Sequence, residues 1–130
     1  MIALDTNVLV RWIARDDPVQ SAHADEILQE PFFVSPSVLT ELGWVLQTRI
    51  GMDRAKIAFS VSKLMSLPTA NLPFAANLRW AVERYATQGD WGDLIHIATS
   101  TEAEAFGSFE KQLVKQAGPN APVPIINLNP

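Results

Sequence analysis

Five acidic residues of this chain have the type and spacing to bind a metal ion: Asp5, Glu41, Asp90, Asp93 and Glu110. The chain has no cysteine and only two histidines, so disulfides, thiolate zinc sites and cysteine nucleophiles are excluded. Carboxylate oxygens are the principal ligands that remain, and they select hard divalent cations such as Mg²⁺. Each acid also has a structural explanation that must be weighed against this chemistry.

Asp5 directly follows the apolar strand expected over Met1–Leu4. A carboxylate at the carboxyl end of a parallel strand lies at the sheet edge where α/β folds gather their ligands. Asp is equally a favoured N-cap, and a helix is expected from Thr6 to about residue 14. Thr6 and Asn7 share this ambiguity, since each could cap the helix or orient Asp5 through a hydrogen bond.

Glu41 lies in a helix expected from Ser35 to about Arg49. The residues three and four positions away from it on this helix are Ser37, Val38, Trp44 and Val45. This spacing predicts that Glu41 lies on the apolar side of the helix. A glutamate is rarely buried without a partner, because removing its charge from water is unfavourable. The partner is either a basic side chain at the edge of the core or a metal ion. We favour the metal ion.

Asp90 and Asp93 follow Gly89 and open the next expected helix, where Asp90 can cap and Asp93 can occupy the third position. The same spacing directs both carboxylates to one side of the first helical turn. Capping and metal binding are therefore compatible roles. Glu110 is expected in the first turn of a short helix, where an acid is ordinary, so it carries little information alone.

The elements that must position these acids alternate along the chain. Strands are expected near residues 1–4, 32–34, 105–107 and 123–127, with helices between them that begin at cap or proline signals such as Asp17-Pro18, Ser35-Pro36 and Asp53. This alternation predicts a three-layer α/β fold with a mainly parallel sheet of four or five strands. The length of 130 residues predicts a single domain over 1–130.

Composition limits the classes of function. No apolar run approaches the 18 or so residues of a membrane span, and Met1 leads directly into a core strand, so we expect a soluble, cytoplasmic protein. The net charge of −4 argues against a nucleic-acid partner. Leaving aside the five acids named above, however, nine acids face ten lysines and arginines, so the rest of the chain is close to neutral.

Taken in order, four segments resemble the successive motifs of PIN domains, specifically the VapC-type toxins of bacterial toxin–antitoxin pairs: Asp5-Thr6-Asn7, Leu39-Thr40-Glu41-Leu42, Asp90-Trp91-Gly92-Asp93-Leu94-Ile95 and Ser108-Phe109-Glu110-Lys111. The resemblance covers essentially the whole chain. It implies a Rossmann-like α/β/α fold, Mg²⁺- or Mn²⁺-dependent endoribonuclease activity, homodimerisation and neutralisation by a small cognate antitoxin.

The resemblance also assigns roles to residues. It implies that Asp5, Glu41 and Asp93 are catalytic metal ligands, that Asp90 and Glu110 support them, and that neighbouring polar side chains orient them by hydrogen bonds: Thr6, Asn7 and Ser108. The family usually has Asp where this chain has Glu110, and Thr where it has Ser108. The extra methylene changes the reach of that ligand.

The chain lacks a convincing pair of nucleophile and base for covalent catalysis. The residues therefore favour hydrolysis by a metal-activated water. A phosphatase of the haloacid dehalogenase type also begins with an Asp after an apolar strand, but it needs a second Asp where this chain has Asn7. A catalytically weak or inactive PIN-like binding module, with the acids acting only as caps or as a docking patch, is the remaining alternative. Exposed tryptophans could serve a protein partner, although sequence alone does not choose among the four.

Overall fold

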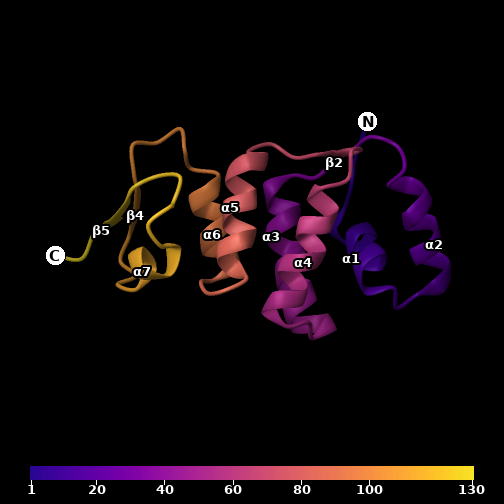
Figure 1. The fold of residues 1–130 in the computed structure, drawn as a ribbon, viewed down its shortest axis with the longest axis horizontal. Helices are drawn as coiled ribbons and strands as arrows, with labels where there is room; N and C mark the ends of the chain where they lie inside the picture. Colours follow the sequence, from indigo (N-terminus) through magenta and orange to yellow (C-terminus); the bar gives the residue numbers. More distant parts are fainter.

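The computed structural model describes residues 1–130 as a series of short elements spread along one long axis (Figure 1). In chain order these are β1 (Ile2–Ala3), α1 (Thr6–Ala14), α2 (Pro18–Ile27), β2 (Phe32–Phe33), α3 (Pro36–Val45), the π-helix η1 (Leu46–Ile50), α4 (Arg54–Met65), β3 (Ala70–Asn71), α5 (Ala75–Tyr85), α6 (Trp91–Ala98), β4 (Phe106–Ser108), α7 (Leu113–Ala117) and β5 (Ile125–Asn127). Strands alternate with helices, so the α/β class is confirmed.

Cap residues place the helix starts as the sequence predicts. The Asp17 side chain accepts hydrogen bonds from two backbone N–H groups at the start of α2. Ser35 accepts from the Val38 N–H at 3.2 Å, and Asp53 accepts from the Lys56 N–H at 2.8 Å. Each cap satisfies a backbone donor that has no partner inside the helix.

Three features of the middle of the chain differ from expectation. The helix predicted to continue to about Arg49 changes to π geometry at Leu46 and ends at Gly51, which has a left-handed φ of 80°. Strand β3 was not predicted from the sequence. Pro73 also predicts a helix start, but α5 begins two residues later because Phe74 takes a left-handed conformation with φ of 59°.

The five strands are all parallel, but they form two sheets rather than one. The first sheet has the order β1-β2-β3, and the second pairs β4 with β5. Figure 1 shows β4 and β5 at the end of the molecule opposite β1 and α2. A small apolar cluster of Ile97, Leu113, Ala117 and Val123 holds this second unit against the end of α6. One four- or five-stranded sheet is therefore not observed, and β1 and β4 each have one paired neighbour.

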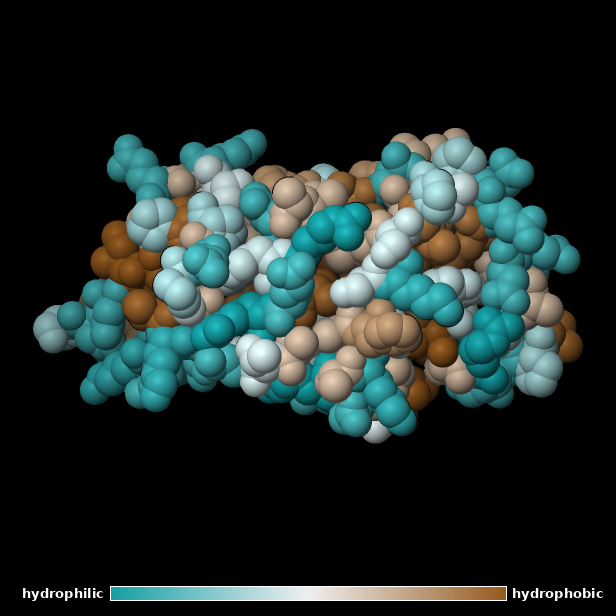
Figure 2. All heavy atoms as spheres, viewed as in Figure 1, coloured by the Kyte–Doolittle hydropathy of each residue, from teal (hydrophilic) through white to brown (hydrophobic).

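The main core contains 22 buried residues, most of them from α1, α3, α4, α5 and α6, such as Leu9, Leu39, Leu64 and Leu78, and it also includes Phe32 of β2. Figure 2 shows polar residues over much of one face, with apolar residues reaching the surface in patches between them. None of the helices combines the length and the apolar character needed to cross a membrane.

Candidate active site

Asp5 and Glu41 line the same cavity, which has a volume of about 400 Å³. Asp5 stands at the carboxyl end of β1, as the sequence predicts, and it also caps α1 by accepting a hydrogen bond from the Thr6 N–H at 2.8 Å. That bond uses one carboxylate oxygen. The cap and ligand interpretations are therefore compatible, because the second oxygen is not engaged in the helix.

The Thr6 hydroxyl is the one buried side-chain oxygen or nitrogen in the chain without a hydrogen-bond partner. Thr6 is 4% exposed and lines the cavity that Asp5 and Glu41 share. Buried polar groups are nearly always paired, because leaving one unpaired costs about 1–3 kcal/mol. The unpaired hydroxyl therefore belongs to a residue that lines the same cavity as two carboxylates.

Glu41 is exposed, so the prediction that it lies on a buried apolar face is wrong. The buried side of α3 is formed by Leu39, Leu42 and Gly43, and Glu41 projects from the opposite side of the helix. The sequence misled because Trp44, which is apolar by type, is itself 53% exposed. The two ion pairs of the chain are Arg11–Asp16 and Arg15–Asp25, so no basic side chain neutralises Glu41.

A second cavity of about 410 Å³ lies beside the first, and Glu41 and Trp44 line both. Asp90 lines this second cavity and caps α6, accepting a hydrogen bond from the Asp93 N–H at 3.0 Å. The predicted capping role of Asp90 is thus confirmed. Glu41 thus shares one cavity with Asp5 and the other with Asp90.

Asp93 is half-buried, and its pKa is raised above the usual value. Burial is the largest cause, since it disfavours the charged form. The negative charges of Asp90 and Glu110 raise the pKa further, and the nearby His96 opposes them. Like charges therefore act on one another at the start of α6, which a bound cation would relieve.

The sequence predicts Glu110 in the first turn of a helix, but in the structure it precedes the turn at residues 111–112, and α7 begins only at Leu113. Its carboxylate accepts a hydrogen bond from the Gln112 N–H at 3.1 Å. Its own N–H donates to the Ser108 hydroxyl at 3.0 Å, so Ser108 fixes the backbone of the turn. Nothing in this geometry tests whether Glu110 binds a metal, and that role stays a prediction.

A stack of side chains that the sequence analysis did not single out holds the start of α6 against α3. The indole N–H of Trp91 donates to the Leu39 carbonyl oxygen at 2.9 Å, and Trp91 packs so closely on Gly43 that a Cβ there would lie 2.2 Å from Trp91 Nε1. The ring of Tyr85 meets Trp91 edge-on at 5.0 Å. Glycine inside a helix was the available signal for this close approach.

Arg54 supports the same region from α4. Its guanidinium donates to the Tyr85 carbonyl oxygen at 3.0 Å and to the Gly89 carbonyl oxygen at 2.6 Å, and it lies 4.4 Å from the Tyr85 ring centroid. These bonds fix the loop that delivers Asp90. Arg54 therefore positions an acid of the candidate site without touching the cavity that holds it.

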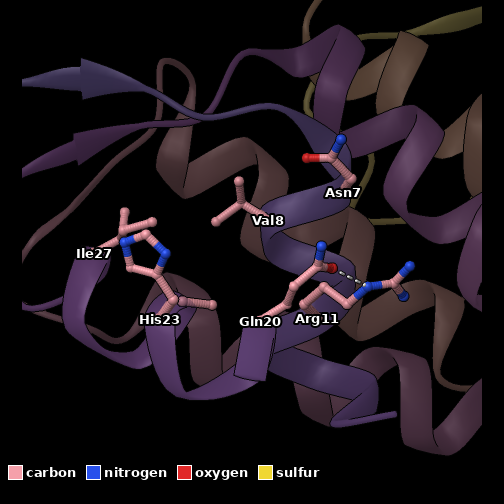
Figure 3. Close-up of a pocket in the computed structure, with 7 residues that line it drawn as sticks. Asn7, Val8, Arg11, Gln20, His23 and Ile27 are labelled. Carbon is pink, nitrogen blue, oxygen red and sulfur yellow. Dashed lines mark hydrogen bonds between the residues drawn. The ribbon is translucent and has the colours of Figure 1, made fainter. Parts of the chain in front are cut away.

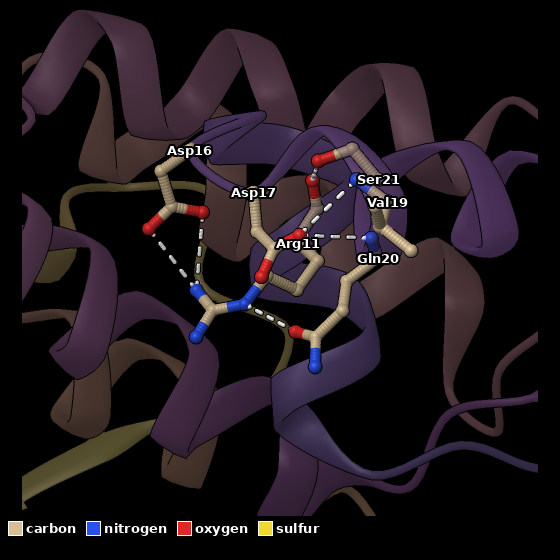
Figure 4. A network of polar contacts seen from close by, with 6 residues as sticks. All are labelled: Arg11, Asp16, Asp17, Val19, Gln20 and Ser21. Atoms are coloured by element: carbon tan, nitrogen blue, oxygen red, sulfur yellow. Dashed lines mark hydrogen bonds and ion pairs between the residues drawn. The ribbon is translucent and has the colours of Figure 1, made fainter.

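On the other side of the first cavity, Arg11 is held in a network between α1 and α2 (Figure 4). It donates to both carboxylate oxygens of Asp16 at 3.1 Å and to the Gln20 side chain at 2.8 Å. Asn7 and Arg11 also line a third hollow of about 330 Å³ toward His23 (Figure 3). Shared residues thus connect three hollows in a row along the molecule.

The donor set fits a hard divalent cation in its chemistry. Asp5, Glu41 and the Thr6 hydroxyl supply only oxygen, and Mg²⁺ is commonly held by one or two carboxylates together with waters and substrate phosphates. The structure contains no group of three or more acids or histidines close enough together to hold a metal ion. Asp5 and Glu41 share one cavity, Glu41 and Asp90 share another, and Asp93 is influenced by the charges of Asp90 and Glu110, so the single cluster expected from the sequence is not observed.

Comparison with known proteins agrees with the motifs. Among curated proteins and among solved structures, none matches the chain. The family model described as the PIN domain matches residues 2–118, which is most of the chain and includes all five acids. The chain therefore belongs to the PIN-domain family, whose members have an α/β Rossmann-like fold and are generally metal-dependent nucleases.

Proposed function

We propose that this PIN domain is a Mg²⁺- or Mn²⁺-dependent endoribonuclease of the VapC toxin type, acting in the cytoplasm and neutralised by a cognate antitoxin. One observation carries the proposal: Asp5 and Glu41, neither of which has a basic partner, share a cavity with the orphaned hydroxyl of Thr6. Asp5 uses only one carboxylate oxygen to cap α1, and the Glu41 side chain makes no hydrogen bond or ion pair, so both acids keep oxygens free, as metal-binding acids must.

In this proposal Asp5 and Glu41 hold the cation from two elements, β1 and α3. Asp93 contributes from α6, with Asp90 and Glu110 as further acids whose charges favour a cation nearby. When bound, the metal supplies an activated water and stabilises the charge that develops on the leaving oxygen of a phosphodiester.

The remaining polar residues position groups around these acids. The Thr6 N–H fixes one oxygen of Asp5 and leaves the other free of hydrogen bonds. The Thr6 hydroxyl has no partner in the fold, and in this proposal it donates to a ligand oxygen. Asn7 stands where the first cavity meets the third hollow and can donate its amide to a phosphate.

The decisive experiment is cleavage of RNA by the purified chain with and without Mn²⁺. Asp5→Asn, Glu41→Gln and Asp93→Asn are each expected to abolish cleavage, and the resemblance to VapC-type toxins implies new 5′-phosphate ends. Glu26→Gln is a suitable control, because Glu26 is exposed on α2 and its side chain makes no hydrogen bond or ion pair. Equal cleavage by wild type and Asp5→Asn would exclude the proposed metal site.

The alternative is a PIN-like binding module in which the acids serve only as caps. Millimolar Mn²⁺ should raise the melting temperature of the wild type but not of Asp5→Asn if Asp5 binds the metal. Unchanged melting of both proteins would favour the binding module. This comparison is independent of which RNA is used.

We also propose that the chain forms a homodimer and binds its antitoxin through exposed apolar surface. In support, β1 and β4 each leave one edge unpaired, and Met1 and Ile2 are 78% and 64% exposed beside the β1 edge. Unpaired edges with apolar side chains favour association. Light scattering of the pure chain, and of the chain expressed together with a short reading frame next to its gene that would encode the antitoxin, would measure both associations; a monomer in each case would refute them.

A further inference from the structure

Trp44 is an aromatic side chain that the fold leaves open between the two acidic cavities. It is 53% exposed and lines both of them. Of the other three tryptophans, Trp91 is buried and Trp12 and Trp80 are partly buried against the core. A single exposed apolar residue is ordinary, so Trp44 is informative because of its place between the two acidic cavities and not because of its exposure alone.

The π-helix η1 brings a basic side chain to this ring. Trp44 lies near the end of α3, and Arg49 lies in η1, which continues directly from α3. The Arg49 guanidinium lies 5.4 Å from the centroid of the indole ring. Arg49 belongs to neither of the two ion pairs, so its charge is available to an anion.

We propose that Trp44 and Arg49 form a subsite for one nucleotide of single-stranded RNA. The base stacks on the exposed part of the indole, and the phosphate binds the Arg49 guanidinium. The proposal rests on the nuclease function and names where the substrate is held. Stacking accepts any base, because every base offers a flat π-face.

The position of Trp44 sets which nucleotide this is. Glu41 precedes Trp44 by three residues on α3, which is about 5 Å along the helix axis and on the same side. That distance is less than one nucleotide of extended chain. The stacked base therefore belongs to a nucleotide adjoining the phosphodiester that lies against Asp5 and Glu41.

The surroundings favour RNA over a protein partner. The cavity beside Trp44 is lined mainly by polar residues: Ser37, Thr40, Glu41, Gln47 and Asp90. An amphipathic helix of a partner would need a row of apolar side chains to pack on, whereas Trp44 and Trp91 are the only large apolar residues in this lining. A flat ring, a free guanidinium and polar neighbours together match a base, a phosphate and a ribose.

The test is binding of a short fluorescent single-stranded RNA to the full chain in EDTA, where the proposed cleavage cannot occur. Trp44→Leu should raise the dissociation constant roughly 5- to 100-fold, which is the effect of losing one stacked base. Trp44→Phe should retain most of the affinity, since it keeps an aromatic face. Arg49→Gln should weaken binding and reduce its salt dependence by about one charge.

Phe59→Leu is the matched control. Phe59 is 72% exposed on α4 and lines a separate hollow that contains none of the five candidate acids. Its replacement should leave RNA affinity unchanged. A blunt RNA duplex should bind the wild type more weakly than the single strand, because its bases are already stacked on one another.

Unchanged affinity in both Trp44→Leu and Trp44→Phe would overturn the subsite, as would equal binding of duplex and single strand. Loss of antitoxin binding in Trp44→Leu with RNA affinity intact would assign the surface to a protein partner and would also overturn it. Binding in EDTA separates this proposal from the nuclease function. Trp44-dependent RNA binding without cleavage in Mn²⁺ would support the subsite and refute the nuclease.

Discussion

Replacing Thr6 by valine should make the protein more stable and less active. Valine has nearly the shape of threonine and a similar helix propensity, and the Thr6 N–H that bonds Asp5 belongs to the backbone and is retained. Only the hydroxyl is lost, and that hydroxyl is buried without a partner. Its removal should raise the free energy of unfolding by about 1–2 kcal/mol.

Thermal and urea unfolding measure this gain. For a domain of this size, 1 kcal/mol corresponds to roughly 3–5 °C in melting temperature. Thr6→Ser is the matched control, because it keeps the hydroxyl and removes a buried methyl group, which should lower stability by about 1 kcal/mol. In the same two variants, RNA cleavage in Mn²⁺ should fall with Thr6→Val and persist with Thr6→Ser.

A melting temperature of Thr6→Val equal to or lower than that of the wild type would refute the reasoning. The hydroxyl would then be hydrogen-bonded in the folded protein, and its position beside Asp5 and Glu41 would no longer indicate a ligand. A stable Thr6→Val variant with full activity would refute the functional half alone. The two halves are separable because stability and cleavage are measured independently.

Three further predictions concern the support of the acids. Gly43→Ala places a Cβ 2.2 Å from Trp91 Nε1 and should lower the free energy of unfolding by about 1–3 kcal/mol, measured in urea, with cleavage reduced as α6 shifts from α3. Arg54→Met should leave the Gly89 carbonyl oxygen without its donor, cost about 1–3 kcal/mol and increase hydrogen exchange in residues 86–90; exchange unchanged from the wild type would contradict this role. Carboxyl NMR titration should find the pKa of Asp93 above 3.8, falling toward it in Asp90→Asn. A raised pKa means that the folded state holds the proton more tightly than the unfolded state. The free energy of unfolding should therefore fall as pH rises through the interval between 3.8 and the folded pKa of Asp93. Asp93→Asn should remove that dependence.

The sequence predicts those parts of the fold that depend on neighbouring residues. Asp17, Ser35 and Asp53 begin their helices as expected, since a capping side chain bonds N–H groups only two or three residues ahead. Strand pairing joins residues far apart, so the division into two sheets and the existence of β3 left no local signal. The exposure of Glu41 was missed for a related reason, because the environment of Trp44 depends on what packs against α3.

The same distinction explains how the acids are arranged. The carboxylates of Asp5, Asp90 and Glu110 each accept a hydrogen bond from a backbone N–H close by in the sequence. Their positions are therefore fixed by local geometry. Glu41 makes no such bond, and its position depends on the packing of α3 against α6 through Trp91. Glu41 is nevertheless the residue shared by both acidic cavities. The contact between α3 and α6, far from any cap, therefore determines whether the acids of α1 and α6 can act on one substrate.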